Sequence, residues 1–399
     1  MRIRMINKKL DDITKQDIDD LVDNEVRESR TVEYKRQLPA GSDADKKEFL
    51  ADVSSFANTS GGDLLYGVSE EEGIPTSAHG LSNINIDDEI LRLGSILTSG
   101  LEPRIPGTHF RPIEGFSDGP VLMLRIPKSW TSPHMVKFKG SSRFHARTSA
   151  GKYQMDVQQI GSAFSMSESL PERIRQFRDD RLAKIRAGET PMRLIEGAKL
   201  VLHLVPLESF GGDSQLDIAQ IGDQFQPLKG HAIDRRINID GVVSYSLVQG
   251  DDALFVDYCQ VFRSGRLEIV EGALIRSHNN QQIMGSSTYE PAVIEAVPKY
   301  LRALQDLGVS CPIIVMLSML GTLGAYIWID NTVSRNMTTT IDRDVLLLPD
   351  VVIEDYNCDI PKTLRPAFDA VWNASGYPRS INYDENGDWS PYHERGGRR

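Results

Sequence analysis

The chain has 399 residues, a formal net charge of −11 and 25% charged residues, which are proportions typical of a globular protein of about two or three domains. Its three cysteines are odd in number and widely spaced, so they form neither a disulfide framework nor a zinc-binding pattern and favour a cytoplasmic location. The first sixteen residues contain no apolar segment typical of a signal peptide.

The first predicted elements are a helix and then a strand–helix–strand segment. Residues 11–27 carry apolar side chains at helical spacing. The sequence TVEYK suits a short strand, and a helical pattern begins at about Asp45 and ends where Gly61 and Gly62 permit a left-handed turn. The run DLLYGV then predicts a second, buried strand.

Three glutamates flank these two strands. Glu28 and Glu33 lie at the first strand and Glu70 follows the second, so we expect their carboxylates to converge. Converging carboxylates need a cation, and oxygen ligands suit Mg²⁺ or Mn²⁺. Such an ion activates water beside a phosphate that Lys35 and Arg36 would hold. Alternatively, each glutamate is a solvated surface charge, which is the common state of this residue.

A basic segment follows a helix predicted for residues 87–99 and a strand in VLMLRIP. No acidic residue occurs between Gly119 and Met155, and aromatic residues alternate with the cations. This pattern is typical of a surface that follows a nucleic-acid backbone and stacks on bases, although a solvated hairpin with its aromatics in the core has the same composition. The side chains predicted to contact nucleic acid are Arg36, Arg125, Lys128, Lys137, Lys139, Arg143, His145, Arg147 and Lys152.

A basic helix over residues 171–187 is predicted to connect two domains, and its basic face is an alternative extension of the nucleic-acid surface. Strands then dominate, including a hairpin about Ser264 and Gly265. A later helix is expected to be interrupted near Pro298, and a last helix precedes a polar, frayed end. His203, Asp257 and Glu268 are ionisable, but no pattern places them together.

Residues 307–329 contain no charge and are long enough to cross a bilayer. Pro312, Gly321 and Gly324 divide this stretch, and no basic cluster flanks it. We therefore favour two buried strands and expect no membrane contact. Residues 1–190 have 27 basic and 29 acidic side chains, against 18 and 27 for residues 191–399, so a polyanion is expected at the first half.

Several of these sequences resemble the Schlafen domain, an AlbA-like nucleic-acid-binding fold. ESRTVEYKRQL and VSSFANTSGGDLLYGVSEEEGIP are similar to its core, and RIPKSWTSPHMVKFKGSSRFHARTSAGKYQMDVQQI is similar to its closing strands and helix. With the patterns above, this predicts an α+β protein. The expected parts are a Schlafen domain at 1–165, a linker helix at 166–190, a mixed α/β sensor or dimerisation domain at 191–380 and a polar tail at 381–399.

The resemblance also implies a function. In the nuclease members of the family, two glutamates and an aspartate hold a metal that cleaves RNA. The matching positions are Glu28, Glu33 and Glu70, where glutamate replaces the aspartate, and Lys35 would contact the scissile phosphate. The resemblance thus implies a metal-dependent endonuclease acting on RNA such as tRNA, in antiviral defence, and working as a homodimer because this chain has one lobe where eukaryotic members pair two. A non-catalytic nucleic-acid-binding regulator and an interaction protein acting through its acidic half are the alternatives.

Overall fold

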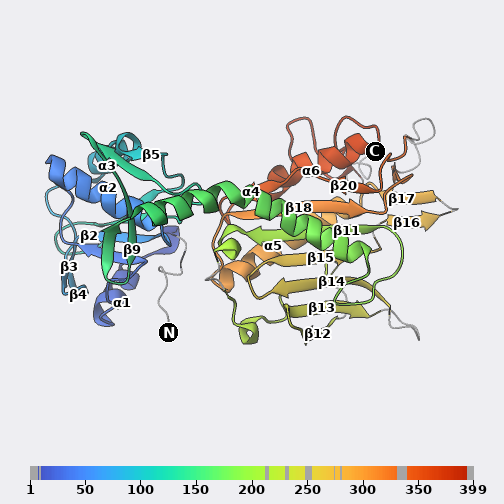
Figure 1. Cartoon of the computed structure of the whole chain (residues 1–399), viewed down its shortest axis with the longest axis horizontal. Coiled ribbons are helices and arrows are strands. Elements are labelled where there is room, and N and C mark those ends of the chain that lie inside the picture. Colours follow the sequence, from blue (N-terminus) through green and yellow to red (C-terminus); the bar gives the residue numbers. More distant parts are fainter. Residues whose placement is uncertain are drawn as a thin grey trace. The chain divides into compact units, whose positions relative to one another are not determined.

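The computed structural model describes residues 8, 10–211, 215–229, 233–247, 254–273, 275–278, 281–329 and 339–392 (Figure 1). The chain divides into two compact units, Met1–Leu170 and Pro171–Arg399. Each unit combines helices with mixed or antiparallel sheets, which confirms the expected α+β class.

The first unit contains the predicted strand–helix–strand segment. Its first sheet has the order β1 (Val32–Lys35), β2 (Gly62–Tyr66), β7 (Val121–Ile126) and β6 (His109–Ile113). The strands β1 and β2 are parallel and α2 (Asp43–Ala57) connects them, so the ends of both strands lie at one edge of the sheet.

Helices cover both faces of this sheet. Helix α2 and α3 (Ile86–Gly100) pack on the face that carries Leu64, while α1 (Lys15–Asp23) packs on the face that carries Leu65. Neighbouring residues of a strand point to opposite faces, which is why β2 has the consecutive apolar residues Leu64 and Leu65. Helix α1 is shorter than predicted because Thr14 and Asp17 form a capping box that sets its start.

A second sheet has the order β10 (Gly151–Gln154), β9 (Ser141–Thr148), β8 (Met135–Phe138) and β5 (Leu101–Glu102). Lys139 and Gly140 form the two-residue loop between β8 and β9, and both have a positive φ, of 44° and 76°. Helix α2 also contacts β9, which explains why every residue from Phe49 to Ala57 is buried. The unit is completed by a 3₁₀ turn (Leu10–Asp12) and by a hairpin of β3 (Val68–Glu71) and β4 (Ile74–Ala78).

The second unit is built on an eight-stranded sheet. Its order is β12 (Ile233–Ile237), β13 (Gly241–Leu247), β14 (Phe255–Phe262), β15 (Leu267–Glu271), β11 (Lys199–Pro206), β18 (Ile313–Leu320) and β20 (Val345–Leu347), with β21 (Val351–Ile353) also paired to β18. The hairpin predicted about Ser264 and Gly265 is confirmed as β14 and β15.

Both faces of this sheet are covered (Figure 1). The helices α5 (Tyr289–Asp306) and α6 (Ile360–Ala374) contribute to the core on one face. The end of α4 (Val157–Arg186) packs on the other face through Leu182 and Ile185. A smaller sheet joins β16 (Ile275–His278), β17 (Gln281–Gly285) and β19 (Tyr326–Trp328), and 3₁₀ turns cover Leu207–Phe210 and Ile218–Gln220.

The structure changes three predictions for the second half. Helix α5 runs through Pro298 without interruption, and α4 begins before the helix predicted at residue 171. The end of the chain was expected to fray, but Asn382 and Tyr383 are buried. Residues 307–329 do contain two strands, although β18 and β19 belong to different sheets. Within the described ranges, no helix is long and apolar enough to cross a membrane.

Candidate carboxylate site and nucleic-acid interface

Glu28 and Glu70 meet at the turn between β3 and β4. The backbone N–H of Gly73 donates to Glu70 Oε2 at 2.6 Å, and its carbonyl accepts from the backbone N–H of Glu28 at 2.6 Å. A Cβ atom at residue 73 would lie 3.4 Å from Glu28 Cβ, and φ there is +76°, so glycine suits this close approach. The expected proximity of these two glutamates is therefore present.

Glu33 is paired with two cations. Its Oε1 lies 2.7 Å from Lys35 Nζ, and its Oε2 accepts a hydrogen bond from Arg147 Nη1 at 2.8 Å. The guanidinium of Arg147 lies 3.6 Å from the ring centroid of Phe56 and also donates to the carbonyl of Ser29. Arg147 thus connects β9 to α2 and to the segment that precedes β1.

The glutamates influence one another's protonation. Burial raises the pKa of Glu28; the N–H of Tyr34 partly opposes this, and the charges of Glu33 and Glu70 add to the increase. Burial alone would also raise the pKa of Glu33, but Lys35 and Arg147 outweigh burial and lower it. The three carboxylates are thus near enough to interact, and only Glu33 is strongly neutralised by protein cations.

Basic side chains of the first unit fall into a buried and an exposed group. Arg147 is only 3% exposed, and the half-buried Arg125 is bound to Asp63 at 2.8 Å. On the β8–β9 hairpin, in contrast, Lys137, Lys139 and Arg143 are exposed. The hairpin therefore concentrates accessible positive charge where the sequence predicted a basic surface.

A known sequence family matches the part of the first unit that contains the glutamates and the basic hairpin. Residues 28–156 match the sequence profile of the Schlafen, AlbA_2 family. The first unit carries a Schlafen AlbA_2 domain. This confirms the resemblance and indicates a nucleic-acid-related function for the Schlafen domain.

The other comparisons add little to this. No curated protein matches the chain. Among solved structures, the DIP2311 protein from Corynebacterium diphtheriae shares 14% identity with a TM-score of 0.25, over 35% of this chain and 29% of that chain. The chain thus matches less than a third of the length of that protein.

The three glutamates predicted to bind a metal already have partners within the Schlafen domain. Both oxygens of Glu33 face cations, and one oxygen each of Glu28 and Glu70 accepts a backbone N–H. Over the described part of the chain, no three His, Cys, Asp or Glu side chains are grouped so as to hold a metal ion. The donor set in this arrangement does not fit a divalent ion, because Lys35 and Arg147 occupy the oxygens that Glu33 would offer.

Asp52 of α2 belongs to the same charge cluster, although it was not among the residues predicted from the sequence. Its Oδ1 lies 2.5 Å from Lys152 Nζ, and Lys152 also pairs with Glu48. Burial, with the charge of Glu33 added, raises the pKa of Asp52 to about 6. The sequence did contain a signal, since Asp52 follows Phe49 by three residues and so lies on the apolar face of the helix. A small cavity of about 120 Å³ lies beside it, between Lys35 and Tyr66.

The structure corrects the role predicted for several basic residues of the Schlafen domain. Arg147 is buried against Glu33 and Phe56, so it acts inside the fold rather than as a surface contact. Arg125 bridges Asp63 and the carbonyl of Lys8, and the half-buried Lys152 is held by Asp52 and Glu48. The sequence segment lacked acids, but acids from distant segments pair with its cations.

The remaining predicted contacts are accessible to different extents. The side chains of Arg36 and Arg143 are exposed and make no hydrogen bond or ion pair with any residue the structure describes. Lys137 and Lys139 form exposed pairs with Glu102 at 2.7 Å and with Asp43 at 2.5 Å. Lys128 lies over the ring of Trp130, and His145 is half-buried with a lowered pKa, mainly because of burial.

The second unit contains a charge cluster that the sequence did not reveal. His203 and Glu268 are opposite each other on β11 and β15, and His203 Nε2 lies 3.0 Å from Glu268 Oε2. Arg181 donates to both oxygens of Glu268, at 2.7 and 2.8 Å, and Tyr258 donates at 2.7 Å. Burial would raise the pKa of Glu268, but these donors lower it to about 2. No sequence pattern placed these residues together, and the structure brings His203 and Glu268 into contact.

Proposed function

We propose that the Schlafen domain binds nucleic acid, with RNA favoured, through the exposed cations of the β8–β9 hairpin and Arg36. The observation that carries this proposal is the set of Lys137, Lys139 and Arg143 on one hairpin that has no acidic residue of its own. A phosphate backbone supplies the negative charge that this hairpin lacks, and binding would release counterions from it.

The existing ion pairs of the hairpin are compatible with this role. Lys137 and Glu102 retain 61% and 58% side-chain exposure in their pair. Exposed pairs of this kind contribute little to stability, because solvent and salt screen them. Phosphate groups would therefore displace Glu102 and Asp43 from the two lysines at small cost, while Arg143 is already available.

Fluorescence anisotropy with a labelled RNA hairpin and a matched DNA hairpin tests this proposal. We expect Arg143→Ala to weaken RNA binding by roughly tenfold, because an arginine–phosphate contact is lost. Arg343→Ala is the matched control, since Arg343 is an exposed arginine of the second unit that pairs with Asp342 and lies outside the basic helix. Equal binding by parent and Arg143→Ala would contradict the proposed surface.

Metal-dependent endonuclease activity on RNA is a second candidate function. It is supported by the interaction of three carboxylates, since Glu33 and Glu70 both raise the pKa of Glu28. Lys35 lies beside Glu33 and would contact the scissile phosphate. The candidate requires Glu33 to leave at least one of its two cations before Mg²⁺ or Mn²⁺ binds.

Incubating the protein with tRNA, in Mn²⁺ or in chelator, separates this candidate from a non-catalytic regulator. A nuclease is expected to cut only with Mn²⁺, and Glu33→Gln should stop cutting while RNA affinity is retained. Glu114→Gln, at an exposed glutamate outside the cluster, is the control. Binding without any cutting in Mn²⁺ would favour the regulator.

The homodimer and the antiviral role stay predictions. Light scattering over a range of protein concentrations tests the dimer, and a monomer throughout would exclude it. Phage challenge of cells that carry the parent or Glu33→Gln protein tests the role in defence. Equal protection by both would show that defence does not depend on this site.

A further inference from the structure

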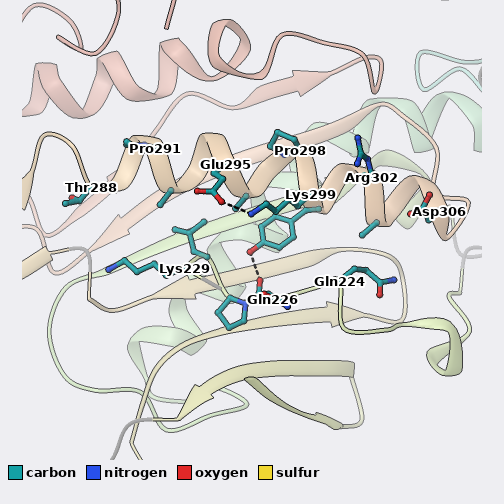
Figure 2. A pocket seen from close by; sticks show the side chains of 16 residues that line it. Gln224, Gln226, Lys229, Thr288, Pro291, Glu295, Pro298, Lys299, Arg302 and Asp306 are labelled. Carbon is teal, nitrogen blue, oxygen red and sulfur yellow. Dashed lines mark hydrogen bonds and ion pairs between the residues drawn. The ribbon is translucent and has the colours of Figure 1, made fainter. Parts of the chain in front are cut away.

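The second unit contains a large groove between α5 and the segment 224–229. The groove has a volume of about 970 Å³, which is the size of a pocket for a small organic ligand. Tyr300 donates from its hydroxyl to the carbonyl of Gln226 at 2.6 Å and so joins the two walls (Figure 2). Phe225 and Leu228 are buried and hold the segment in place.

The walls of the groove combine apolar surface with free amide groups. Its apolar lining is provided by Pro227, Leu228, Pro291, Ala292, Ala296, Pro298 and Ala303. The exposed side-chain amides of Gln224 and Gln226 make no hydrogen bond to any side chain or backbone group in the described ranges. Such amides offer a donor and an acceptor together, which matches the hydrogen-bonding edge of a nucleobase.

The groove is more basic than the half of the chain that contains it. Residues 191–399 have 18 basic and 27 acidic side chains, yet three cations and two acids line the groove. The cations are Lys229, Lys299 and Arg302, and the acids are Glu295 and Asp306. Figure 2 shows Lys229 toward one end of the groove and Gln224 toward the other.

Two of these cations are held in ways that leave them available to an anion. Lys299 Nζ lies 2.7 Å from Glu295 Oε1, in a pair with 66% and 74% side-chain exposure. Lys229 Nζ lies 4.0 Å from Glu271 Oε1, which is too long for a hydrogen bond. Burial raises the pKa of Glu271 to about 7, so near neutral pH this carboxyl is only partly charged and attracts Lys229 less.

We propose that this groove binds a nucleotide, with its phosphates at Lys229 and Lys299 and its base against the proline- and alanine-rich wall near the glutamine amides. Cations supply charge-assisted contacts to phosphate, and the apolar wall covers a flat ring. The second unit would then be a ligand-binding module, distinct from the nucleic-acid surface of the Schlafen domain.

Isothermal titration of the full chain with ATP tests the proposal, with adenosine and inorganic tripolyphosphate as partial ligands. We expect ATP to bind with a dissociation constant below about 1 mM and each partial ligand to bind at least roughly tenfold more weakly. Failure of ATP to bind at that concentration would overturn the proposal, and so would tripolyphosphate binding as tightly as ATP.

Variants locate the ligand in the groove. Lys229→Ala and Lys299→Ala should each weaken ATP binding by roughly tenfold, and Ala292→Tyr should block it by filling the space. Glu295→Gln should tighten binding several-fold, since it removes the acid that competes for Lys299. Lys362→Ala, at an exposed lysine of α6, and Arg143→Ala should bind ATP as the parent does. Groove variants that bind like the parent would overturn the assignment.

Discussion

Each unit contains a buried arginine–glutamate pair, and the two pairs differ in what surrounds them. Glu268 is fully enclosed, and Arg181, His203 and Tyr258 all donate to it. Glu33 retains 10% side-chain exposure and lies near the charges of Glu28 and Asp52. The enclosed pair lowers the pKa of its carboxylate to about 2, whereas the pair of the first unit lies beside Glu28 and Asp52, whose pKa values are raised.

The difference shows how the same residue types serve two purposes. In the second unit Arg181, His203 and Tyr258 pair with Glu268 inside the sheet and its covering helix, so the cluster holds α4 to the sheet. In the first unit the cations oppose an excess of carboxylates at the edge of a parallel strand pair. Clusters of like charges held at an accessible edge are typical of functional sites, while enclosed and fully paired clusters are typical of structural ones.

The largest expected effect is in the enclosed pair. Glu268→Gln should lower the unfolding free energy of the second unit by about 4 kcal/mol, because Arg181 would stay buried without a counter-charge. Urea denaturation, monitored by hydrogen exchange of the backbone amides of β11 and β15, measures this loss of unfolding free energy. Glu172→Gln, at an exposed glutamate of α4, is the control. A loss of unfolding free energy below about 1 kcal/mol would show that the cluster does not stabilise the second unit.

A smaller loss is expected in the first unit. Arg147→Met keeps a long apolar side chain beside Phe56 but removes the guanidinium that lies over its ring and pairs with Glu33, and should cost about 3 kcal/mol. Lys35 remains near Glu33, which limits the effect. Hydrogen exchange in β1 and β9 reports the change. An unchanged exchange rate there would show that Arg147 is not part of the internal support.

The contributions of Asp52 and Glu268 to stability should depend on pH in opposite directions. The pKa of Asp52 is raised from 3.8 to about 6, so its contribution to stability is complete below pH 3.8 and is lost as the pH rises to 6. The pKa of Glu268 is lowered from 4.5 to about 2, so its contribution is present above pH 4.5 and is lost as the pH falls to 2. Each change is about 3 kcal/mol at most.

Unit-resolved hydrogen exchange at several pH values measures both trends. Asp52→Asn should flatten the profile of the first unit between pH 4 and 6 and leave that of the second unit unchanged. An unchanged pH profile of the first unit in Asp52→Asn would contradict the environment assigned to Asp52.

The smallest effect on stability is expected at the hairpin. Lys137→Ala removes an exposed pair with Glu102 and should leave the unfolding free energy of the first unit unchanged. RNA affinity should fall in the same variant, because the lysine would contact a phosphate. A variant that lost stability without losing affinity would assign Lys137 to the structure instead of the interface.

The sequence predicted the strand–helix–strand segment of the first unit well, because local signals set it. Helix α2 begins after the cap Ser42 and ends before Gly61, and the short apolar run after that turn favoured the buried strand β2. These features depend on residues close together in the sequence. The meeting of Glu28 with Glu70 has a different cause, because Glu28 precedes β1 and Glu70 follows β2, so the parallel pairing alone would not join them. Gly73, in the turn between β3 and β4, contacts both residues.

The sequence did not predict which charged residues of distant segments pair with each other. The segment that contains Arg147 has no sequence signal that predicts Glu33, 114 residues away, as its partner. His203 and Glu268 become neighbours only through the register of β11 and β15. The basic surface was therefore overestimated, since Arg125, Arg147 and Lys152 are bound to acids that the fold brings to them.

The salt dependence of RNA binding tests the central claim most directly. If the β8–β9 hairpin contacts phosphates, RNA affinity should fall steeply as the salt concentration rises. In a plot of log affinity against log salt concentration, Arg143→Ala should reduce the steepness of the slope by about 1. A flat dependence, or the same slope in parent and variant, would contradict the claim that this hairpin binds nucleic acid.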